Sequence, residues 1–232
     1  MRKNIAIITA GGSGRRFGSN KKKQFVEIAN RPILFWTIDK FVRYDEIHKI
    51  IITLPPEDFA EQQELIEKEF HSHIFKFVKG GKERQNSVFN ALSACSRDTD
   101  FVFIHDGVRP FISLEEIKKL HENALKFDAV IPGYKVKNTI KQIGGNQIKK
   151  TVPRQALIAV LTPQIFRYSI IWECHQKAKK DNIICTDDAA LLEYFNIPVH
   201  WIECSSKNIK ITEPNDLRLA EFYLKNEMEK NT

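Results

Sequence analysis

Residues 4–18 read Asn-Ile-Ala-Ile-Ile-Thr-Ala-Gly-Gly-Ser-Gly-Arg-Arg-Phe-Gly, an apolar run that stops at a glycine-rich stretch. The apolar part, residues 4–9, predicts a strand that is buried on both faces of a sheet. The glycines predict a loop directly after that strand. In parallel α/β sheets, ligands bind at the carboxyl ends of the strands. This stretch therefore predicts both a fold class and the position of a site.

The rest of the chain alternates short β-rich runs with helical patterns. Pro32 opens a helix with apolar residues at helical spacing, and Ser113 with Glu116 predicts a capping box for a helix that ends near Lys126. Further strands are predicted at 48–54, 74–78, 100–105, 129–136 and 199–202. Further helices are predicted at 57–70, at 83–96, from a turn at 162–164 to about 180, after a Thr186 cap, and around 217–228. This alternation predicts an α/β fold with a Rossmann-like, mostly parallel sheet and helices on both faces.

Residues 137–153 interrupt this alternation. Two alternating runs, 138–143 and 147–152, flank a Gly-Gly-Asn turn and predict a protruding β-hairpin arm. An isolated two-stranded hairpin with so few apolar residues is marginally stable, so we expect the arm to pack on another surface, such as a second subunit. We expect residues 1–232 to form a single domain that carries this arm.

Composition excludes several classes of protein. With 42% hydrophobic residues, 10 glycines and 9 prolines in 232 residues, the chain is neither disordered nor fibrous. Its apolar runs fall far short of the roughly 20 residues of a membrane helix, and the N-terminal run ends too soon for a signal peptide. The four cysteines form no CxxC pair, which favours reduced thiols in a cytoplasmic protein.

The glycine-rich loop carries the first chemical signal. Its glycines allow backbone N–H groups to face an anion, Arg16 adds a guanidinium fork, and Lys23 adds a point charge. The loop is not a Walker A motif, and Phe17 stands where a dinucleotide-binding motif has its third glycine. A simple glycine turn explains the glycines alone. Together with Arg16 and Lys23 they favour a polyphosphate site.

Several stretches that occur in order along the chain support a more specific reading. They are Ala-Gly-Gly-Ser-Gly-Arg-Arg-Phe-Gly at 10–18, Lys-Gln-Phe at 23–25, Gly-Gly-Lys-Glu-Arg-Gln-Asn-Ser-Val at 80–88, His-Asp-Gly-Val-Arg-Pro at 105–110, Thr-Pro-Gln at 162–164, Thr-Asp-Asp at 186–188 and Asn-Ile-Lys-Ile-Thr at 208–212. Together they resemble the 2-C-methyl-D-erythritol 4-phosphate cytidylyltransferase family, a group of polyol-phosphate cytidylyltransferases. The resemblance spans roughly residues 4–224. It implies transfer of the cytidylyl group of CTP to the polyol phosphate with release of pyrophosphate, Mg²⁺ as cofactor, and a homodimer.

The same resemblance assigns roles to individual residues. The catalytic residues that it implies are Arg16, Lys23, Arg154 and Lys210. The CTP-binding residues that it implies are Ala10, Gly11, Gly12, Gly14, Gly81, Lys82, Ser87, Asp106 and Gly107. The acceptor-binding residues that it implies are Asp106, Arg109, Thr139, Arg154, Thr162, Thr186 and Lys210. No cluster of protein ligands is expected for the metal, which would bind through the CTP phosphates with Asp106 as a candidate ligand.

Local patterns offer simpler readings for some of these residues. Thr139 and Arg154 fit an ordinary strand and a solvated face, Thr186 fits a helix cap, and Lys210 fits a strand lysine. His105 is expected to be structural, because transfer from CTP to a phosphate needs no histidine base.

Three departures from the family pattern concern the acceptor and the loop. Lys22 replaces a proline, which leads us to expect a more mobile loop, and Asn138 replaces an aspartate. Gly107-Val108 replaces Ala-Ala and is similar to ribitol-5-phosphate cytidylyltransferases, which are the alternative within the same class.

A basic nucleic-acid-binding protein is the alternative from another class, given a net charge of +7. Because the basic residues are spread along the chain without a nucleic-acid motif, we expect no nucleic-acid partner and no membrane.

Overall fold

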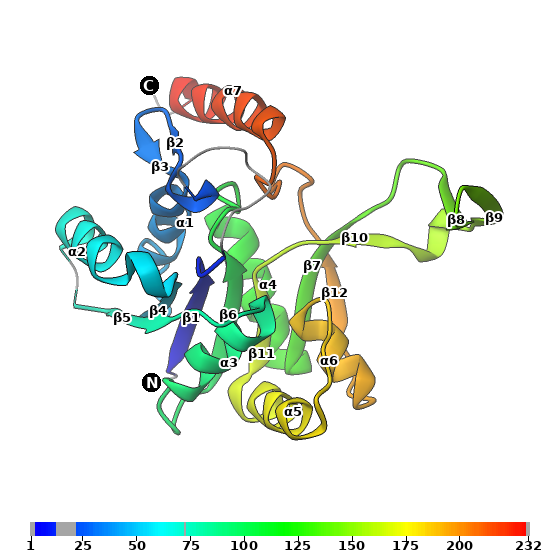
Figure 1. The fold of residues 1–232 in the computed structure, drawn as a ribbon, viewed down its shortest axis with the longest axis horizontal. Coiled ribbons are helices and arrows are strands. Elements are labelled where there is room, and N and C mark those ends of the chain that lie inside the picture. The colour runs from blue at the N-terminus through cyan, green and yellow to red at the C-terminus, as the bar shows by residue number, and fades with distance from the viewer. Residues whose placement is uncertain (1–2, 13–21, 72, 231–232) are drawn as a thin grey trace.

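The computed structural model of the protein describes residues 3–12, 22–71 and 73–230. The strands of its main sheet are β1 (Asn4–Thr9), β4 (Ile47–Leu54), β5 (Phe75–Lys79), β6 (Phe101–Asp106), β7 (Ala129–Lys135), β10 (Ile158–Val160), β11 (Gln164–Arg167) and β12 (His200–Glu203). They form one eight-stranded sheet in the order β10-β7-β11-β6-β1-β4-β5, with β12 paired to β7 (Figure 1). The predicted α/β fold with a mostly parallel sheet is confirmed.

Strand β1 lies between β4 and β6 and is parallel to both. Its residue Thr9 is level with Thr53 of β4 and Asp106 of β6, so the three strands end together. Alternate residues of β1 enter two different apolar cores, with Ala6 in one and Ile7 in the other. A strand buried on both faces explains the unbroken apolar run in the sequence.

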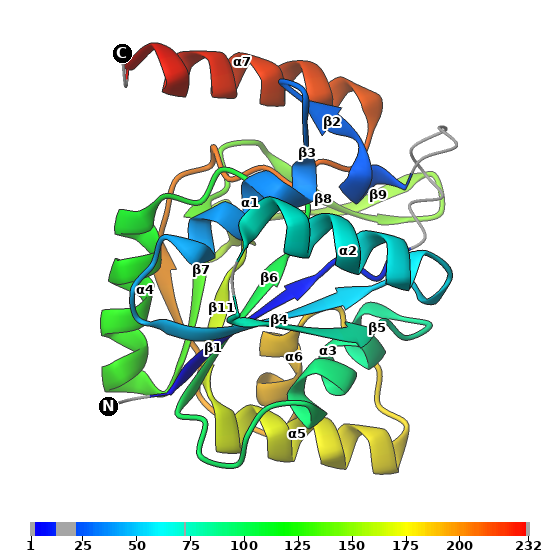
Figure 2. The ribbon, with the colours of Figure 1, turned by 90° about the vertical axis from the view of Figure 1, so that its left-hand side faces the viewer.

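Helices cover both faces of the sheet, as predicted. Helices α1 (Ile33–Val42), α2 (Phe59–Phe70) and α4 (Leu114–Phe127) pack on one face, and α3 (Arg84–Ser93), α5 (Tyr168–Asp181) and α6 (Asp188–Tyr194) pack on the other (Figure 2). The capping box of Ser113 and Glu116 is present at the start of α4. Helix α7 (Pro214–Lys230) lies beside the short strands β2 (Glu27–Ile28) and β3 (Arg31–Pro32). Across the residues that the structure describes, no helix is both long enough and apolar enough to span a membrane.

Two local predictions are corrected. The segment predicted as a turn at 162–164 leads at once into β11, which pairs antiparallel with both β6 and β7. Thr186 is exposed and does not cap α6; the cap is Asp187, whose carboxylate accepts a hydrogen bond from the backbone N–H of Ala190 at 3.0 Å. The predicted helix at 57–70 is α2 preceded by a 3₁₀ turn, η3 (Pro56–Asp58).

The predicted hairpin arm is present. Strands β8 (Ile140–Gly144) and β9 (Gln147–Val152) pair antiparallel and project away from the main sheet (Figure 1). Gly145 at the tip has a φ of 58°, which glycine adopts without strain. Ile143 and Ile148 are each 66% exposed, so in this chain the arm leaves apolar side chains in solvent.

Candidate active site

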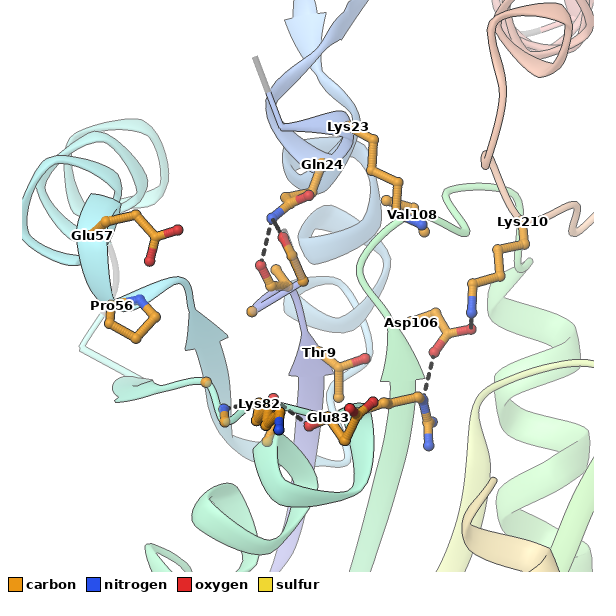
Figure 3. Close-up of a pocket in the computed structure, with 17 residues that line it drawn as sticks. Thr9, Lys23, Gln24, Pro56, Glu57, Lys82, Glu83, Asp106, Val108 and Lys210 are labelled. Atoms are coloured by element: carbon orange, nitrogen blue, oxygen red, sulfur yellow. Dashed lines mark hydrogen bonds and ion pairs between the residues drawn. The ribbon is translucent and has the colours of Figure 1, made fainter. Parts of the chain in front are cut away.

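A cavity of about 680 Å³ opens at the carboxyl ends of β1, β4 and β6. The residues that line it are Thr9, Ala10, Gly11, Gly12, Lys23, Gln24, Pro56, Glu57, Gly80, Gly81, Lys82, Glu83, Arg84, Ser87, Asp106, Val108 and Lys210. In Figure 3, Pro56 and Glu57 lie on one side, Lys23 and Gln24 lie at the top, and Asp106 with Lys210 lies on the opposite side. The sheet thus places its cavity where parallel α/β folds bind ligands.

One wall is the chain that leaves β1. The backbone N–H of Ala10 donates to the carbonyl oxygen of Thr53 at 3.0 Å. The amide of Gln24, in the 3₁₀ turn η2 (Lys23–Phe25), donates to the carbonyl oxygens of Ala10 and Gly12 at 2.7 and 2.9 Å. These two hydrogen bonds, one buried and one partly buried, therefore fix the backbone at the start of the glycine-rich loop. The predicted residues Gly14 and Arg16 lie outside the described residues.

A second wall is built from closely packed glycines. A Cβ atom on Gly11 would lie 2.9 Å from Cα of Gly80, and Ser87 Oγ is 3.3 Å from the same point. The hydroxyl of Ser87 accepts a hydrogen bond from the backbone N–H of Gly81 at 2.9 Å. The predicted residues Gly11, Gly81 and Ser87 thus meet in one rigid corner, where two backbones approach too closely for any side chain.

The floor is centred on Asp106 at the end of β6. Its carboxylate contacts three cations: Arg84 Nε at 3.0 Å, Lys210 Nζ at 2.9 Å and Arg109 Nε at 3.3 Å. Burial alone would raise the pKa of Asp106, but Arg84, Lys210 and Arg109 hold this pKa well below its usual value. Asp106 is therefore ionised and keeps Lys210 at the cavity.

Arg84 connects the floor to a deeper ion pair. Its Nη1 lies 2.6 Å from Oδ2 of Asp188, and Nε2 of His175 lies 3.1 Å from Oδ1 of the same carboxylate. Burial alone would raise the pKa of Asp188, but Arg84 and His175 lower it. Arg84 lies within a motif used above but was not predicted as a site residue. Its carboxylate partners come from distant parts of the chain, so no local pattern indicates its position.

Three predicted residues do not line the cavity but lie behind Asp106 and the adjoining strand ends. Arg109 donates to the carbonyl oxygen of Asn208 at 2.9 Å, and Thr162 Oγ1 accepts from the backbone N–H of Asp106 at 3.1 Å. Gly107 donates to the carbonyl oxygen of Thr9 at 3.0 Å, joining β6 to β1. These residues hold Asp106 and the strand ends in position.

Three other predicted residues are not brought into this cavity. Thr139, Arg154 and Thr186 are exposed and absent from its lining. Arg154, in the 3₁₀ turn η4 (Arg154–Ala156), donates to the carbonyl oxygen of Lys137, so it binds the base of its own arm. Of the residues predicted for CTP, the cavity of one chain is thus lined by Ala10, Gly11, Gly12, Gly81, Lys82, Ser87 and Asp106. It leaves out the arm residues Thr139 and Arg154 that were predicted for the acceptor.

Sequence reasoning missed part of the lining. Thr9, Gln24, Glu83, Arg84 and Val108 lie in or beside stretches that were singled out, but no role in the site was assigned to them. Pro56 and Glu57 follow the end of a predicted strand, so the rule that ligands bind at carboxyl strand ends was sufficient to find them.

Known proteins resemble this chain over nearly its whole length. Residues 4–226 match the family model of 2-C-methyl-D-erythritol 4-phosphate cytidylyltransferase. Relatives with that name from Clostridium beijerinckii and Geobacillus thermodenitrificans are 41% and 38% identical, over 95% and 94% of this chain and 98% and 96% of theirs. The crystal structure of 4-diphosphocytidyl-2C-methyl-D-erythritol synthase from Anaerococcus prevotii superimposes with a TM-score of 0.86 at 32% identity, covering 97% of this chain and 96% of the other. The chain therefore belongs to the 2-C-methyl-D-erythritol 4-phosphate cytidylyltransferase family.

Proposed function

We propose that this protein transfers the cytidylyl group of CTP to 2-C-methyl-D-erythritol 4-phosphate, giving 4-diphosphocytidyl-2-C-methyl-D-erythritol and pyrophosphate. The observation that carries the proposal is the cavity itself. It combines a tight corner at Gly11, Gly80 and Ser87 with two lysine side chains, Lys23 at the top and Lys210 beside Asp106 (Figure 3). A flat base fits the first feature and phosphates fit the second.

The reaction is an in-line displacement at phosphorus. An oxygen of the acceptor phosphate attacks the α-phosphorus of CTP, the new P–O bond forms, and the bond to the bridging oxygen breaks to release pyrophosphate. The second pKa of a phosphate monoester is about 6, so the acceptor phosphate is largely dianionic at neutral pH. Its attack therefore needs no general base. No histidine is among the described residues that line the cavity. Catalysis then consists of positioning and of stabilising negative charge.

We assign different roles in this positioning and charge stabilisation to three basic residues. We assign Arg16 and Lys23 to the negative charge that develops on the phosphoryl oxygens, and Lys210 to the acceptor and the α-phosphate. Lys210 is already oriented by Asp106, because its Nζ lies 2.9 Å from Oδ2. A charge held in place before the reaction costs no reorganisation when the transition state forms. Arg109 and Thr162 support this arrangement from behind the floor.

Magnesium belongs to the proposal as an ion carried by the triphosphate. Among the described residues, no three His, Cys, Asp or Glu side chains gather into a metal-binding group. Asp106 is ionised and makes three ion pairs, whereas a carboxylate has about four lone-pair sites, so one metal bond fits. Asp106 is thus the residue that would hold the ion, which when bound neutralises phosphate charge.

We also propose a cytoplasmic homodimer joined by the arm at 137–153. The exposed side chains of Ile143 and Ile148 favour a covering surface, and a partner subunit would bring Thr139 and Arg154 to the acceptor. Deleting residues 141–149 should then convert a dimer into a monomer in light scattering after size exclusion. An unchanged dimer would contradict this role of the arm, and a monomeric full-length protein would contradict the dimer itself.

The function is tested by pyrophosphate release with CTP and Mg²⁺. We expect turnover with 2-C-methyl-D-erythritol 4-phosphate and little with ribitol 5-phosphate. Turnover with ribitol 5-phosphate alone would replace the proposed acceptor but keep the nucleotide. Absence of release with both acceptors would reject the proposed reaction.

A further inference from the structure

Lys22 joins two walls of the cavity through an ion-pair bridge. Its Nζ contacts Glu57 and lies 2.6 Å from Oδ2 of Asp58. Lys22 directly precedes Lys23, whereas Glu57 lines the cavity from the wall at the start of α2, across from Lys23 (Figure 3). The sequence predicted a more mobile loop at Lys22, and most of that loop, residues 13–21, lies outside the described residues. The side chain of Lys22 itself is paired with two carboxylates and is only 17% exposed.

Both ends of the bridge are anchored in the fold. On the first wall, the backbone N–H of Phe25 donates to the carbonyl oxygen of Lys22 at 2.9 Å, and Gln24 fixes the next turn against the loop. On the second wall, the backbone N–H of Asp58 donates to the carbonyl oxygen of Pro55 at 3.2 Å. An ion pair between fixed ends loses less side-chain entropy than one between two free surface chains.

The bridge also sets the charge at the rim of the cavity. The hydrogen bond from Lys22 lowers the pKa of Glu57. Burial alone would lower the pKa of Lys22, but Asp58 and Glu57 raise it above its usual value. Lys22 and Glu57 thus stabilise each other's charged forms. Without Lys22, the carboxylate of Glu57 at the cavity and that of Asp58 next to it would leave two negative charges uncompensated near a ligand that itself carries several negative charges, and like charges disfavour binding.

We propose that Lys22 is a positioning residue for the nucleotide: by pairing with Glu57 and Asp58 it fixes Lys23 relative to the wall at Glu57 and compensates the negative charge of the two carboxylates near the triphosphate. This inference rests on the proposed function, because it takes CTP as the occupant of the cavity. It assigns no contact between Lys22 and the nucleotide. The effect of Lys22 must therefore depend on the two carboxylates.

A double-mutant cycle measures that dependence. The variants are Lys22→Met, the pair Glu57→Gln with Asp58→Asn, and all three together, each assayed by pyrophosphate release at varied CTP and varied acceptor. We expect Lys22→Met to raise the KM for CTP about three- to fivefold with the KM for the acceptor unchanged. In the background without the carboxylates, the same substitution should change the KM for CTP less than twofold. Lys22→Arg should restore near-normal KM, because it keeps the charge.

Several results would overturn the inference. Equal effects of Lys22→Met in both backgrounds would mean that Lys22 acts without the carboxylates, and an unchanged KM for CTP would mean that the bridge does not matter. A fall in kcat with all KM values unchanged would indicate a merely structural role. If Lys22→Met does not fold, a second cycle replaces it. This cycle consists of Lys22→Gln, Asp58→Asn and the two together. Lys118→Met, at an exposed lysine of α4, serves as the matched control.

Failure of the proposed function remains distinguishable from failure of the bridge. Absence of turnover and of CTP binding by calorimetry in the unmodified protein would reject the function, and the inference about Lys22 with it. Normal turnover in the unmodified protein with additive effects in the cycle would reject the bridge alone.

Discussion

The hydroxyl oxygen of Thr162 lies 3.0 Å from Nδ1 of His105, and Nε2 of the same ring lies 2.9 Å from the carbonyl oxygen of Arg109. A carbonyl oxygen can only accept, so Nε2 carries the proton and Nδ1 accepts from the hydroxyl of Thr162. The oxygen of Thr162 in turn accepts from the backbone N–H of Asp106. A neutral imidazole therefore holds the end of β6 in position, in agreement with the structural role expected for His105.

This arrangement predicts a loss of stability in mild acid. Burial lowers the pKa of His105 to about 4, against an ordinary value of 6.5. Because the folded pKa is the lower one, the unfolded chain binds more protons between these values, and stability falls as the pH drops through this window. We expect His105 to contribute a loss of about 2 kcal/mol between pH 7 and pH 5. Denaturant unfolding at both pH values measures it.

The control for this prediction is His105→Gln, which removes the titrating ring. The variant should lose about 2 kcal/mol less than the unmodified protein between the two pH values, whatever its stability at pH 7. Asp106 and Asp188 do not affect the comparison, since their lowered pKa values place their titration below this window. An equal pH dependence in both proteins would assign the loss to other groups.

Lys23→Ala should impair catalysis without unfolding the protein. Removing one preorganised donor of positive charge typically costs about 2.7–4 kcal/mol in the transition state, or roughly 10²–10³ in kcat. Pyrophosphate release measures the rate, and circular dichroism checks the fold. Lys118→Ala, which removes an exposed lysine from α4, should retain normal turnover. Near-normal turnover of Lys23→Ala would remove Lys23 from the catalytic residues.

The close packing of Gly11 on Gly80 predicts that alanine substitutions at Gly11 and at its neighbour Gly12 differ in their effect on stability. Gly11→Ala would place its Cβ 2.9 Å from Cα of Gly80, and since backbone must move, we expect a loss of about 1–3 kcal/mol of stability. The Cβ of Gly12→Ala meets nothing within 4 Å in the described structure, so its stability should stay within about 1 kcal/mol. Denaturant unfolding of both variants provides the comparison. Equal losses would show that Gly11 and Gly80 are not in tight contact.

The N-terminal cap of α6 predicts different losses of stability for substitutions at two adjacent residues, Thr186 and Asp187. Asp187 accepts from the backbone N–H of Ala190 and, at 2.7 Å, from the side chain of Gln164. Asp187→Ala should therefore cost about 1 kcal/mol or more of stability, while Thr186→Ala should cost little. Thermal unfolding distinguishes the two variants. The reverse order would restore Thr186 as the cap.

Local chemistry explains which parts of the fold were predictable. The strand at 4–9 and the capping box at Ser113 are specified by adjacent residues, and the structure has both. Strand β11 has only four residues, and its place between β6 and β7 depends on partners elsewhere in the chain. Thr186 and Asp187 are both good capping residues, so their sequence alone does not decide which one caps α6.

The same distinction applies to the site. Ala10, Gly11 and Gly12 were predictable because a glycine-rich loop follows a buried strand. Arg84 was not, because its carboxylate partners lie 22 and 104 residues away along the chain. Arm residues such as Arg154 entered the predicted site only through the family resemblance, and in a single chain they lie outside the cavity.

Strand β1 determines how accurately residues 10–12, which begin the glycine-rich loop, are placed. Its alternate residues pack in two cores, so a slip of one residue would exchange every side chain between faces and move residues 10–12 by about 3.3 Å. Catalytic groups tolerate displacements of only about 0.5 Å. The register of β1 therefore offers residues 10–12 no intermediate position. Damage to either core should reduce the number of active molecules and leave the rate of each surviving molecule intact.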